Sequence, residues 1–469
     1  MNTMFKGGET MRFGSFEEML SFYAADSDAV ALIYGDGDVK KEITYSQLID
    51  AVNEKSAELI ESGKTSIGII CSSSVECIVT IFAAVNAKMQ VVLLDNSLSD
   101  EKLEKLITAA DIDCIWSDEE ETVNALSGFL TDGVEKNASR ILFFTSGTTS
   151  MSKVVVLTEK SLCSSAFNGS AILPLDKADI LLSLLPLSHV FGFVCSLLWG
   201  LSCGCAVALS RGVRYLMTDF TFFKPTAVSL VPMLLGFFIK NNLFNEELNL
   251  ILVGAGDCPD ALLDAAKQMG KRVCFGYGLT ETSSGVALSV SDNPRAMEIC
   301  PDDEILIAPD GEILISAPTC IMQGYYKDKK STDEAIEDGL LHSGDLGYLD
   351  ENGRLHITGR KKEMLVLPSG TKIFLPEYEG ALAKALGNTE LAVILIDSKP
   401  VLVIKETEEN RDKTLNIINE EMKKHPRSHQ LSQVVFTDKP LPRTATGKIK
   451  RWEIQKTTEE QKNGKNDQR

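Results

Sequence analysis

Short apolar runs alternate along much of the chain with longer stretches that have helical spacing. The runs cover residues 141–144, 180–185, 205–209, 226–231, 250–253 and 272–275, and segments such as 259–269 between them read as helices. Strands with two buried faces that alternate with helices are typical of parallel sheets. The pattern therefore predicts an α/β fold with parallel-rich sheets and helices.

The pattern changes after residue 293. Segments 311–315, 339–349 and 354–358 read as antiparallel strands, and Asn352-Gly353 can form the tight turn between two of them. A charged run at 360–363 then precedes a lysine-rich stretch of alternating helix and strand. We expect a small C-terminal domain joined by a polar hinge, with a frayed tail from residue 457 onward.

Residues 190–209 carry no charge and are numerous enough to span a membrane as a helix. Gly200, Gly204 and the neighbouring cysteines instead indicate a buried helix, a break and then a strand at 205–209. We therefore expect this stretch to lie in the protein core, with no membrane span.

Composition narrows the possible partners. The chain has 469 residues with 66 acidic and 47 basic side chains, a formal charge of -19, which disfavours binding to nucleic acids or anionic membranes. Most of the 11 cysteines stand alone in apolar stretches, as expected of reduced thiols, and the N-terminus lacks the apolar core of a secretory signal. The expected location is the cytoplasm.

A first candidate for chemistry follows the apolar run 141–144. It is a loop of small hydroxyl residues that ends in a lysine, comprising Thr145, Ser146, Gly147, Thr148, Thr149, Ser150 and Lys153. Such a loop offers N–H groups, hydroxyls and an ammonium to a triphosphate, although alone it could be a simple turn. It is a poor Walker loop, because Ser152 replaces a glycine and Val154 stands where a Mg²⁺-binding hydroxyl is required.

Three further segments could bind a nucleotide. Residues 275–281 bring a glycine-flanked Tyr277, which could stack on a base, before Glu281, which could ligate Mg²⁺. Asp345 lies fifteen residues before Arg360 and could hold ribose hydroxyls. The loop 441–449 presents Lys448 as a cation for a transition state. Alone, residues 275–281 could equally be a strand-to-helix turn. Asp345 alone would be interpreted as a turn cap, and Lys448 alone as part of a solvated loop.

Together, and in this order, the four segments resemble the motifs of the adenylate-forming (AMP-binding) superfamily, which includes acyl-CoA synthetases, aryl ligases and luciferases. The resemblance extends from Ile43-Thr44-Tyr45 to Lys448. It implies a large N-terminal domain (1–359) of parallel-rich sheets with helices and a small antiparallel β subdomain. A hinge at 360–362 and a small mobile α+β C-terminal lid domain (363–469) would complete the chain.

The resemblance also implies a role for each motif. The β- and γ-phosphates would be held by Thr145, Ser146, Gly147, Thr148, Thr149 and Lys153. The adenine would be enclosed by Gly254, Ala255, Gly256, Phe275, Gly276, Tyr277 and Gly278. The catalytic and remaining nucleotide contacts would be Thr280 at the α-phosphate, Glu281 at Mg²⁺, Asp345 at the ribose, Arg360 at the nucleotide, and Lys448 between the carboxylate and the α-phosphate.

The segment 185–192 matches the part of the family that opens the acid pocket. His189 would be a gate at that pocket, or equally a packed core histidine. No acidic residue stands between Asp179 and Asp219 to pair an amino group. The expected apolar wall comprises Leu187, Phe191, Phe193, Val231 and Leu234. Because 364–379 looks most like fatty-acyl ligases, a fatty or other hydrophobic acid is the first expectation.

The implied reaction joins a carboxylic acid to ATP, releases pyrophosphate, and transfers the acyl group from acyl-AMP to a thiol. ATP, Mg²⁺ and coenzyme A or the phosphopantetheine of an acyl carrier protein are the expected cofactors and partners. Two alternatives stay open at this point. One is a stand-alone enzyme that adenylates amino acids or aryl acids, and the other is a catalytically silent nucleotide-binding protein.

Overall fold

The computed structural model describes residues 11–145, 153–366, 372–397, 399–426, 429–443 and 449–466. Contacts divide the chain into two units. The first contains most of the chain up to Ile357, and the second contains Thr358–Arg469 together with Gly344–Leu346. The hinge at 360–362 and the domain limits expected from the sequence stay predictions.

The largest sheet of the first unit has nine strands. They are β1 (Val30–Asp36), β2 (Val39–Thr44), β8 (Ile180–Ser183), β9 (Ala206–Leu209), β10 (Ala227–Leu230), β11 (Leu250–Val253), β12 (Arg272–Leu279), β13 (Ser284–Leu288) and β14 (Glu298–Ile299). Their order is β14-β13-β12-β11-β10-β8-β9-β1-β2. The six neighbours from β12 to β1 pair in parallel, whereas β13, β14 and β2 are antiparallel additions. The predicted apolar strands between residues 180 and 275 therefore lie in one sheet, whereas 141–144 belongs to the other large sheet.

A second sheet has six strands. They are β3 (Ser66–Cys71), β4 (Gln90–Asp95), β5 (Cys114–Trp116), β6 (Arg140–Phe144), β7 (Val154–Leu157) and β17 (Gly324–Tyr325). Their order is β17-β7-β6-β4-β3-β5, with β3 to β6 parallel and β7 and β17 antiparallel. The predicted phosphate loop connects β6 to β7, so it begins at the carboxyl end of a parallel strand.

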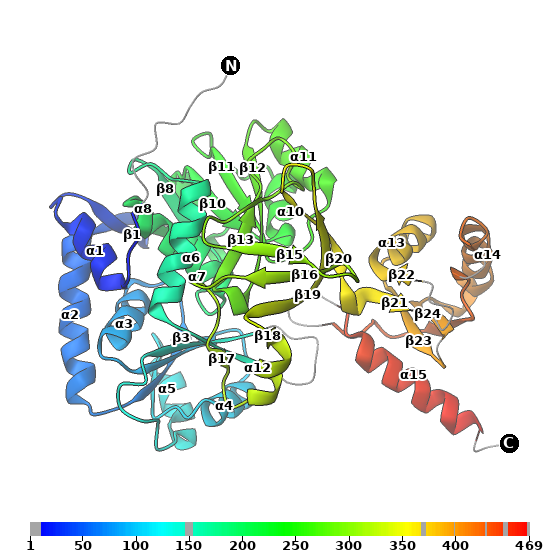
Figure 1. The fold of residues 1–469 in the computed structure, drawn as a ribbon, viewed down its shortest axis with the longest axis horizontal. Coiled ribbons are helices and arrows are strands. Elements are labelled where there is room, and N and C mark those ends of the chain that lie inside the picture. The colour runs from blue at the N-terminus through cyan, green and yellow to red at the C-terminus, as the bar shows by residue number, and fades with distance from the viewer. Residues whose placement is uncertain are drawn as a thin grey trace. The chain divides into compact units, whose positions relative to one another are not determined.

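One apolar core joins the two sheets. Helix α3 (Val75–Asn86) has nine consecutive buried residues, as expected for a helix covered on all sides. The ring of Phe193 packs against both Phe16 and Phe143, which belong to separate elements. The α6 helix (Glu159–Ile172), near the centre of the first unit in Figure 1, packs against β13. The other helices of the unit are α1 (Phe16–Ala24), α2 (Tyr45–Glu61), α4 (Asp100–Ala109), α5 (Glu120–Leu126), α9 (Asp219–Phe223), α10 (Pro232–Lys240), α11 (Asp260–Gln268) and α12 (Lys329–Ala335).

The uncharged stretch 190–209 is part of this core, as predicted. It forms α7 (Val190–Phe193), a π-helical turn at Val194–Leu198, and α8 (Trp199–Cys203) before β9. Gly204 ends the helix in the left-handed region at φ 74°, where the ring of Tyr23 leaves no room for a Cβ atom. Among the described residues no helix is both long and apolar enough to cross a membrane.

The segments after residue 293 form the predicted antiparallel strands. These strands are β15 (Glu304–Ile307), β16 (Glu312–Ser316), β18 (Ile336–Glu337), β19 (Leu340–Leu349) and β20 (Leu355–Arg360). Strands β15 and β16 pair antiparallel, as do β18 and β19. The turn before β20 contains Gly353 at φ 76°, a conformation that favours glycine.

The second unit has its own apolar core. Its elements are β21 (Met364–Val366), β22 (Lys372–Phe374), α13 (Leu375–Leu386), β23 (Leu391–Ile396), β24 (Lys399–Lys405), α14 (Arg411–Met422), β25 (Gln433–Thr437) and α15 (Arg451–Asn466). Helices α13 and α14 pack together over residues such as Leu382 and Ile418. The expectation of a frayed tail from residue 457 was wrong, because α15 continues to Asn466. Glutamate, glutamine and lysine have high helix propensity, so this sequence favours a helix although it contains no apolar residue. Ile454 packs the first turns of α15 into a small apolar cluster.

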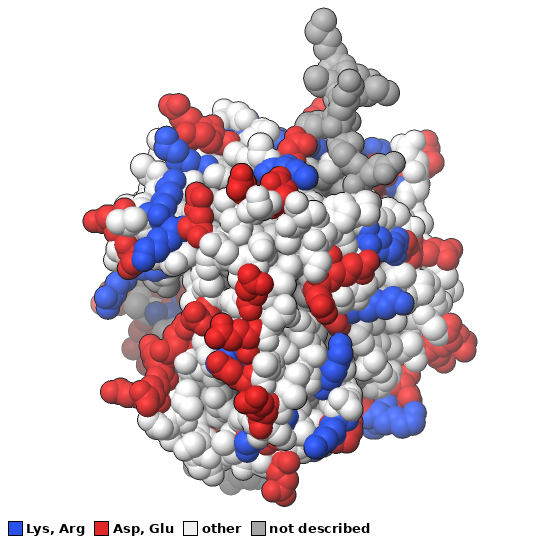
Figure 2. Space-filling view, turned by 90° about the vertical axis from the view of Figure 1, so that its left-hand side faces the viewer, with Lys and Arg blue, Asp and Glu red and all other residues white. Residues whose placement is uncertain are grey.

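Charged side chains of both signs are scattered among uncharged residues on the face drawn in Figure 2. Figure 2 shows the face that carries α1 and α2, with acidic groups prominent in its middle and basic groups interspersed. Some of them form ion pairs within a helix, such as Lys55 with Glu58. The described atoms of this face present no extended basic patch to a polyanion.

Candidate active site

The carboxyl ends of strands from both large sheets meet at the candidate site. Asp95 and Thr145 lie at the ends of β4 and β6, whereas His189 and Glu281 follow β8 and β12 of the other sheet. Two contacts cross between the sheets at this edge, one from Asp95 to His189 and one through Tyr325 to Glu281. Ligands of α/β folds commonly bind at this end of the strands. Within the first unit, Lys153 and Glu281 are thereby linked through Tyr325.

The two ends of the phosphate loop are held together. The Thr145 amide donates to the Lys153 carbonyl oxygen at 3.0 Å, and the Lys153 amide donates to the Thr145 hydroxyl at 3.2 Å. The predicted phosphate-binding residues between them, Ser146, Gly147, Thr148 and Thr149, lie outside the described residues. These two hydrogen bonds fix the positions at which the loop leaves and rejoins the sheet.

Tyr325 lies between the loop lysine and the predicted metal ligand. The Lys153 Nζ atom is 4.2 Å from the centroid of the Tyr325 ring. The Tyr325 hydroxyl donates to Oε1 of Glu281 at 2.7 Å. Burial, followed by the charge of Glu281, raises the pKa of Tyr325, which keeps the phenol protonated as a donor. Three residues from distant parts of the sequence thus form one chain of contacts.

The backbone before and after Glu281 is tightly constrained. A register shift lies between Tyr277 and Gly278 on β12, where a Cβ atom on Gly278 would come within 1.7 Å of the Ser284 carbonyl oxygen. Ser283 and Ser284 have φ values of 53° and 115°, which L residues rarely adopt. Such strain persists where the surroundings enforce it, often at functional sites. The constrained backbone on both sides fixes the short turn that carries Thr280 and Glu281.

The predicted adenine-binding residues lie at the ends of β11 and along β12. Gly254 faces the ring of Phe191, and a Cβ atom there would come within 2.8 Å of it. Ala255 adopts φ 60°, and Gly256 follows in the same turn. Phe275 and Gly276 belong to β12.

The predicted aromatic stacking residue is less accessible than the sequence suggested. Tyr277 is buried with only 8% of its surface exposed, and it packs in the main core. A ring in this position supports the strand more than it presents an open stacking face.

His189 contacts a carboxylate that the sequence interpretation missed. Its Nε2 atom lies 3.4 Å from Oδ2 of Asp95. The His189 contact, with help from the Ser97 backbone, lowers the pKa of Asp95 to about 2, so the carboxylate stays ionised. The available signal was the position of Asp95 at the carboxyl end of a buried strand. Because 42% of the His189 side chain is exposed, it is not a packed core histidine.

The expected apolar wall of the acid pocket divides into two groups. Phe193 and Leu187 are buried in the core, so these two residues do not face open space. Phe191, Val231 and Leu234 are partly exposed near the ends of β8 and β10. The prediction of Phe193 as a wall residue was wrong, because its ring fills the space between Phe16 and Phe143.

The second unit holds the predicted ribose ligand. Arg360 Nε lies 3.0 Å from Oδ1 of Asp345, which is buried while the Arg360 side chain is about half exposed. Gly359 precedes this arginine at φ 152°, where the Phe374 ring leaves no room for a Cβ atom. Lys448 lies outside the described residues, so its role stays a prediction.

Glu281 is a suitable ligand for a nucleotide-bound Mg²⁺. In the described ranges no group of three or more His, Cys, Asp and Glu side chains is placed to hold a metal alone. Mg²⁺ commonly takes one or two carboxylates from the protein and completes its shell with phosphates and water. A single carboxylate that is linked through Tyr325 to the last residue of the predicted phosphate loop is compatible with that mode.

The family model described as AMP-binding enzyme matches residues 22–326 of this chain. The chain belongs to the AMP-binding enzyme family. The 2-succinylbenzoate–CoA ligase of Bacillus mycoides is 26% identical to it, over 90% of this chain and 95% of the relative. The ligase of the same name from Bacillus cytotoxicus has the same identity and coverage. The enzyme class expected from the motifs, an acid–thiol ligase of the adenylate-forming type, is confirmed.

Solved structures of AMP-binding enzymes share the fold. The o-succinylbenzoate CoA synthetase MenE from Bacillus subtilis, in complex with its acyl-adenylate intermediate OSB-AMP, has a TM-score of 0.77 at 23% identity, covering 93% of this chain and 97% of that one. ATP-bound MatB from Rhodopseudomonas palustris has a TM-score of 0.76 at 19% identity, and the match covers 95% of this chain and 99% of MatB. Another MenE structure holds ATP and magnesium. The predicted fold class is confirmed.

Proposed function

We propose that this protein activates a carboxylic acid with ATP and transfers it to the thiol of coenzyme A. In the first step a carboxylate oxygen bonds to the α-phosphorus, pyrophosphate leaves, and acyl-AMP forms. In the second step the thiol sulfur bonds to the acyl carbon, the thiol proton is released, and AMP leaves. The observation that carries this proposal is the match to acid–CoA ligases over 90% of the chain.

The residue types of the motifs suit the first step. Lys153, at the end of the phosphate loop, would bind the β- and γ-phosphates with the loop amides. Glu281 would hold Mg²⁺, which when bound neutralises phosphate charge and withdraws electrons from the α-phosphorus. Asp345 would accept hydrogen bonds from the ribose hydroxyls, and Arg360 would keep that carboxylate aligned. Lys448 would bridge the incoming carboxylate and the α-phosphate.

For the acid we propose an aromatic or aryl-substituted carboxylate ahead of a fatty acid. The named relatives act on 2-succinylbenzoate, and another similar structure is an anthranilate CoA ligase. Phe191, partly exposed beside Gly254, offers an aromatic face to such a ring. An α-amino group gains little here, because Asp95 is already paired with His189. Fatty acids, the first expectation from the sequence, become the second choice.

The experiment is pyrophosphate release from ATP over an acid panel. The panel comprises 2-succinylbenzoate, benzoate, anthranilate, graded fatty acids and free amino acids, each with and without coenzyme A and with a holo carrier protein. Release with aryl acids, and thioester formation with coenzyme A, are expected. Release with amino acids only would favour the amino-acid adenylating alternative. Tight ATP binding without release for any acid would indicate a silent nucleotide-binding protein.

A further inference from the structure

We propose that Tyr325 is a positioning residue that holds Lys153 and Glu281 apart and aims each at its part of the nucleotide. This inference rests on the proposed ATP-dependent function and assigns a residue outside the four motifs. Its basis is the contact chain from Lys153 through the Tyr325 ring and hydroxyl to Glu281.

The fold fixes Tyr325 beside the phosphate loop. Strand β17 pairs with β7, so that Tyr325 lies opposite Val155, two residues after Lys153. The Tyr325 amide also donates to the Thr332 hydroxyl at 2.8 Å. Gly324, at φ 138°, passes too close to the Thr332 side chain for a Cβ atom. Backbone contacts on both sides therefore determine where the ring lies.

A ring between these two charges has a physical purpose. A lysine and a glutamate in one partly buried site attract each other and would neutralise each other as an ion pair. The described residues show no ion pair between Lys153 and Glu281, and the phenol separates them. The π face holds the ammonium weakly enough to release it to a phosphate. The hydroxyl end orients Glu281 through a hydrogen bond and brings no charge of its own.

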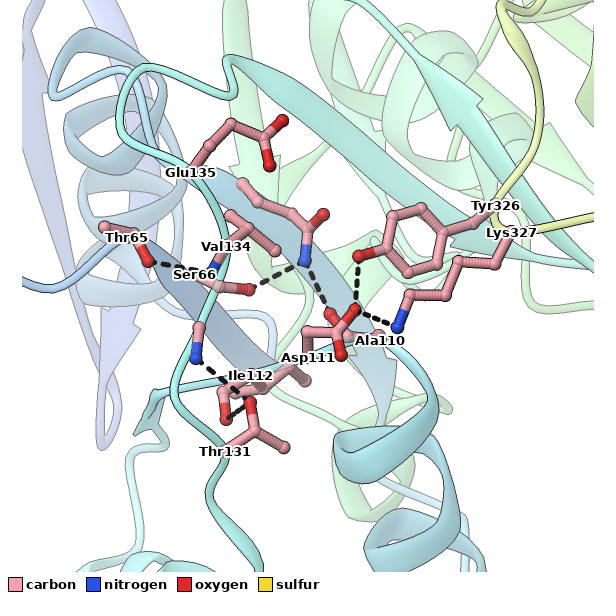
Figure 3. Close-up of polar contacts among 12 residues, drawn as sticks. Thr65, Ser66, Ala110, Asp111, Ile112, Thr131, Val134, Glu135, Tyr326 and Lys327 are labelled. Carbon is pink, nitrogen blue, oxygen red and sulfur yellow. Dashed lines mark hydrogen bonds and ion pairs between the residues drawn. The ribbon is translucent and has the colours of Figure 1, made fainter.

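The neighbouring tyrosine makes entirely different contacts. The Tyr326 hydroxyl donates to Oδ2 of Asp111 at 2.5 Å, and the Lys327 ammonium pairs with the same carboxylate (Figure 3). The Arg140 guanidinium lies 5.1 Å from the Tyr326 ring centroid. Tyr326 is thus an adjacent, partly buried tyrosine that contacts neither Lys153 nor Glu281, and it provides a matched control.

The test compares Tyr325→Phe, Tyr325→Leu and Tyr326→Phe in acid-dependent ATP–pyrophosphate exchange. Tyr325→Phe keeps the ring but loses the hydroxyl, so the Mg²⁺ concentration for half-maximal rate should rise about fivefold, with the KM for ATP at saturating Mg²⁺ within about twofold. Tyr325→Leu also frees Lys153 to pair with Glu281. The Mg²⁺ concentration for half-maximal rate and the KM for ATP should therefore both rise about tenfold. The KM for the acid should stay unchanged in both variants, and Tyr326→Phe should match the wild type.

ATP binding by calorimetry, with and without Mg²⁺, gives a second readout that does not require turnover. If the wild type binds ATP but catalyses no pyrophosphate exchange, the proposed function is wrong. The ratio of the ATP dissociation constants with and without Mg²⁺, compared between wild type and variants, still tests the role of Tyr325. The inference is overturned if both Tyr325 variants resemble Tyr326→Phe in these constants. It is also overturned if they lower only the maximal rate and the thermal stability, since that is the result of a purely structural role.

Discussion

Asp95 and His189 join two sheets across the candidate active site, with the Asp95 carboxylate 3.4 Å from the His189 imidazole. Asp95 ends a strand of the six-stranded sheet, and His189 follows a strand of the nine-stranded sheet. The pair gives His189 a fixed orientation at the predicted mouth of the acid pocket. It also provides the site with a carboxylate that none of the sequence motifs contains.

Replacing Asp95 with asparagine should change the pH dependence of stability. The pKa of Asp95 is lowered in the folded protein to about 2, so its stabilising contribution is present above pH 4 and is lost as the pH falls to 2. We expect Asp95→Asn to lower the free energy of unfolding by about 1–2 kcal/mol at pH 7, with the difference vanishing near pH 2. Urea denaturation of both proteins between pH 2 and pH 7 measures this difference in the free energy of unfolding. The exposed Asp118, bonded to Ser74, supplies the control variant Asp118→Asn, and parallel pH profiles for both variants would contradict the assignment.

Replacing Lys448 with alanine should separate the two half-reactions. The family resemblance assigns Lys448 to adenylation only, where it would neutralise charge that develops at the α-phosphate. We expect Lys448→Ala to slow acid-dependent pyrophosphate release by about a hundredfold or more, with thioester formation from supplied acyl-AMP within about threefold of wild type. Equal loss in both assays would rule out this role.

Adding a methyl group at Gly278 should disrupt the turn that carries Glu281. The new Cβ atom would lie 1.7 Å from the Ser284 carbonyl oxygen, a backbone atom that cannot move aside cheaply. We expect Gly278→Ala to cost about 3 kcal/mol of unfolding free energy or more and to abolish pyrophosphate release. Gly285 pairs with Gly278 across the strands but has open space, with the Tyr277 oxygen 3.8 Å away. Gly285→Ala should therefore fold normally, and similar damage from both variants would refute the steric argument.

Asp303 should make the protein less stable as the pH rises. Burial, together with the charge of Asp302, raises the pKa of Asp303 to about 7. Between pH 4 and pH 7 the folded state therefore holds a proton that the unfolded state has lost, so the free energy of unfolding falls with rising pH. Asp303→Asn should remove this slope, equalling wild type near pH 4 and exceeding it by about 2 kcal/mol at pH 8. Denaturation at three pH values tests this, and an unchanged slope in the variant would contradict it.

Local sequence patterns predicted most of the fold correctly. The apolar run 250–253 became β11 with the same limits, and the uncharged run 190–209 became a core helix, a glycine break and a strand. Periodicity reports burial reliably, because strands and helices repeat their contacts along their own length. It does not report which neighbour a buried ring contacts. Phe193, expected in the pocket wall because 185–192 resembles the family's acid-pocket segment, instead packs against Phe16 and Phe143.

By itself the sequence determined the kinds of chemistry present, because hydroxyl loops, single carboxylates and lysines in a set order fit few functions. Tertiary structure alone decided which of these groups share contacts. Asp95 with His189, and Lys153 with Tyr325 and Glu281, are far apart along the chain and belong to no common motif. They come together because ends of strands from two sheets, parallel and antiparallel, lie close together. That arrangement arises from packing of the whole unit and leaves no periodic trace in the sequence.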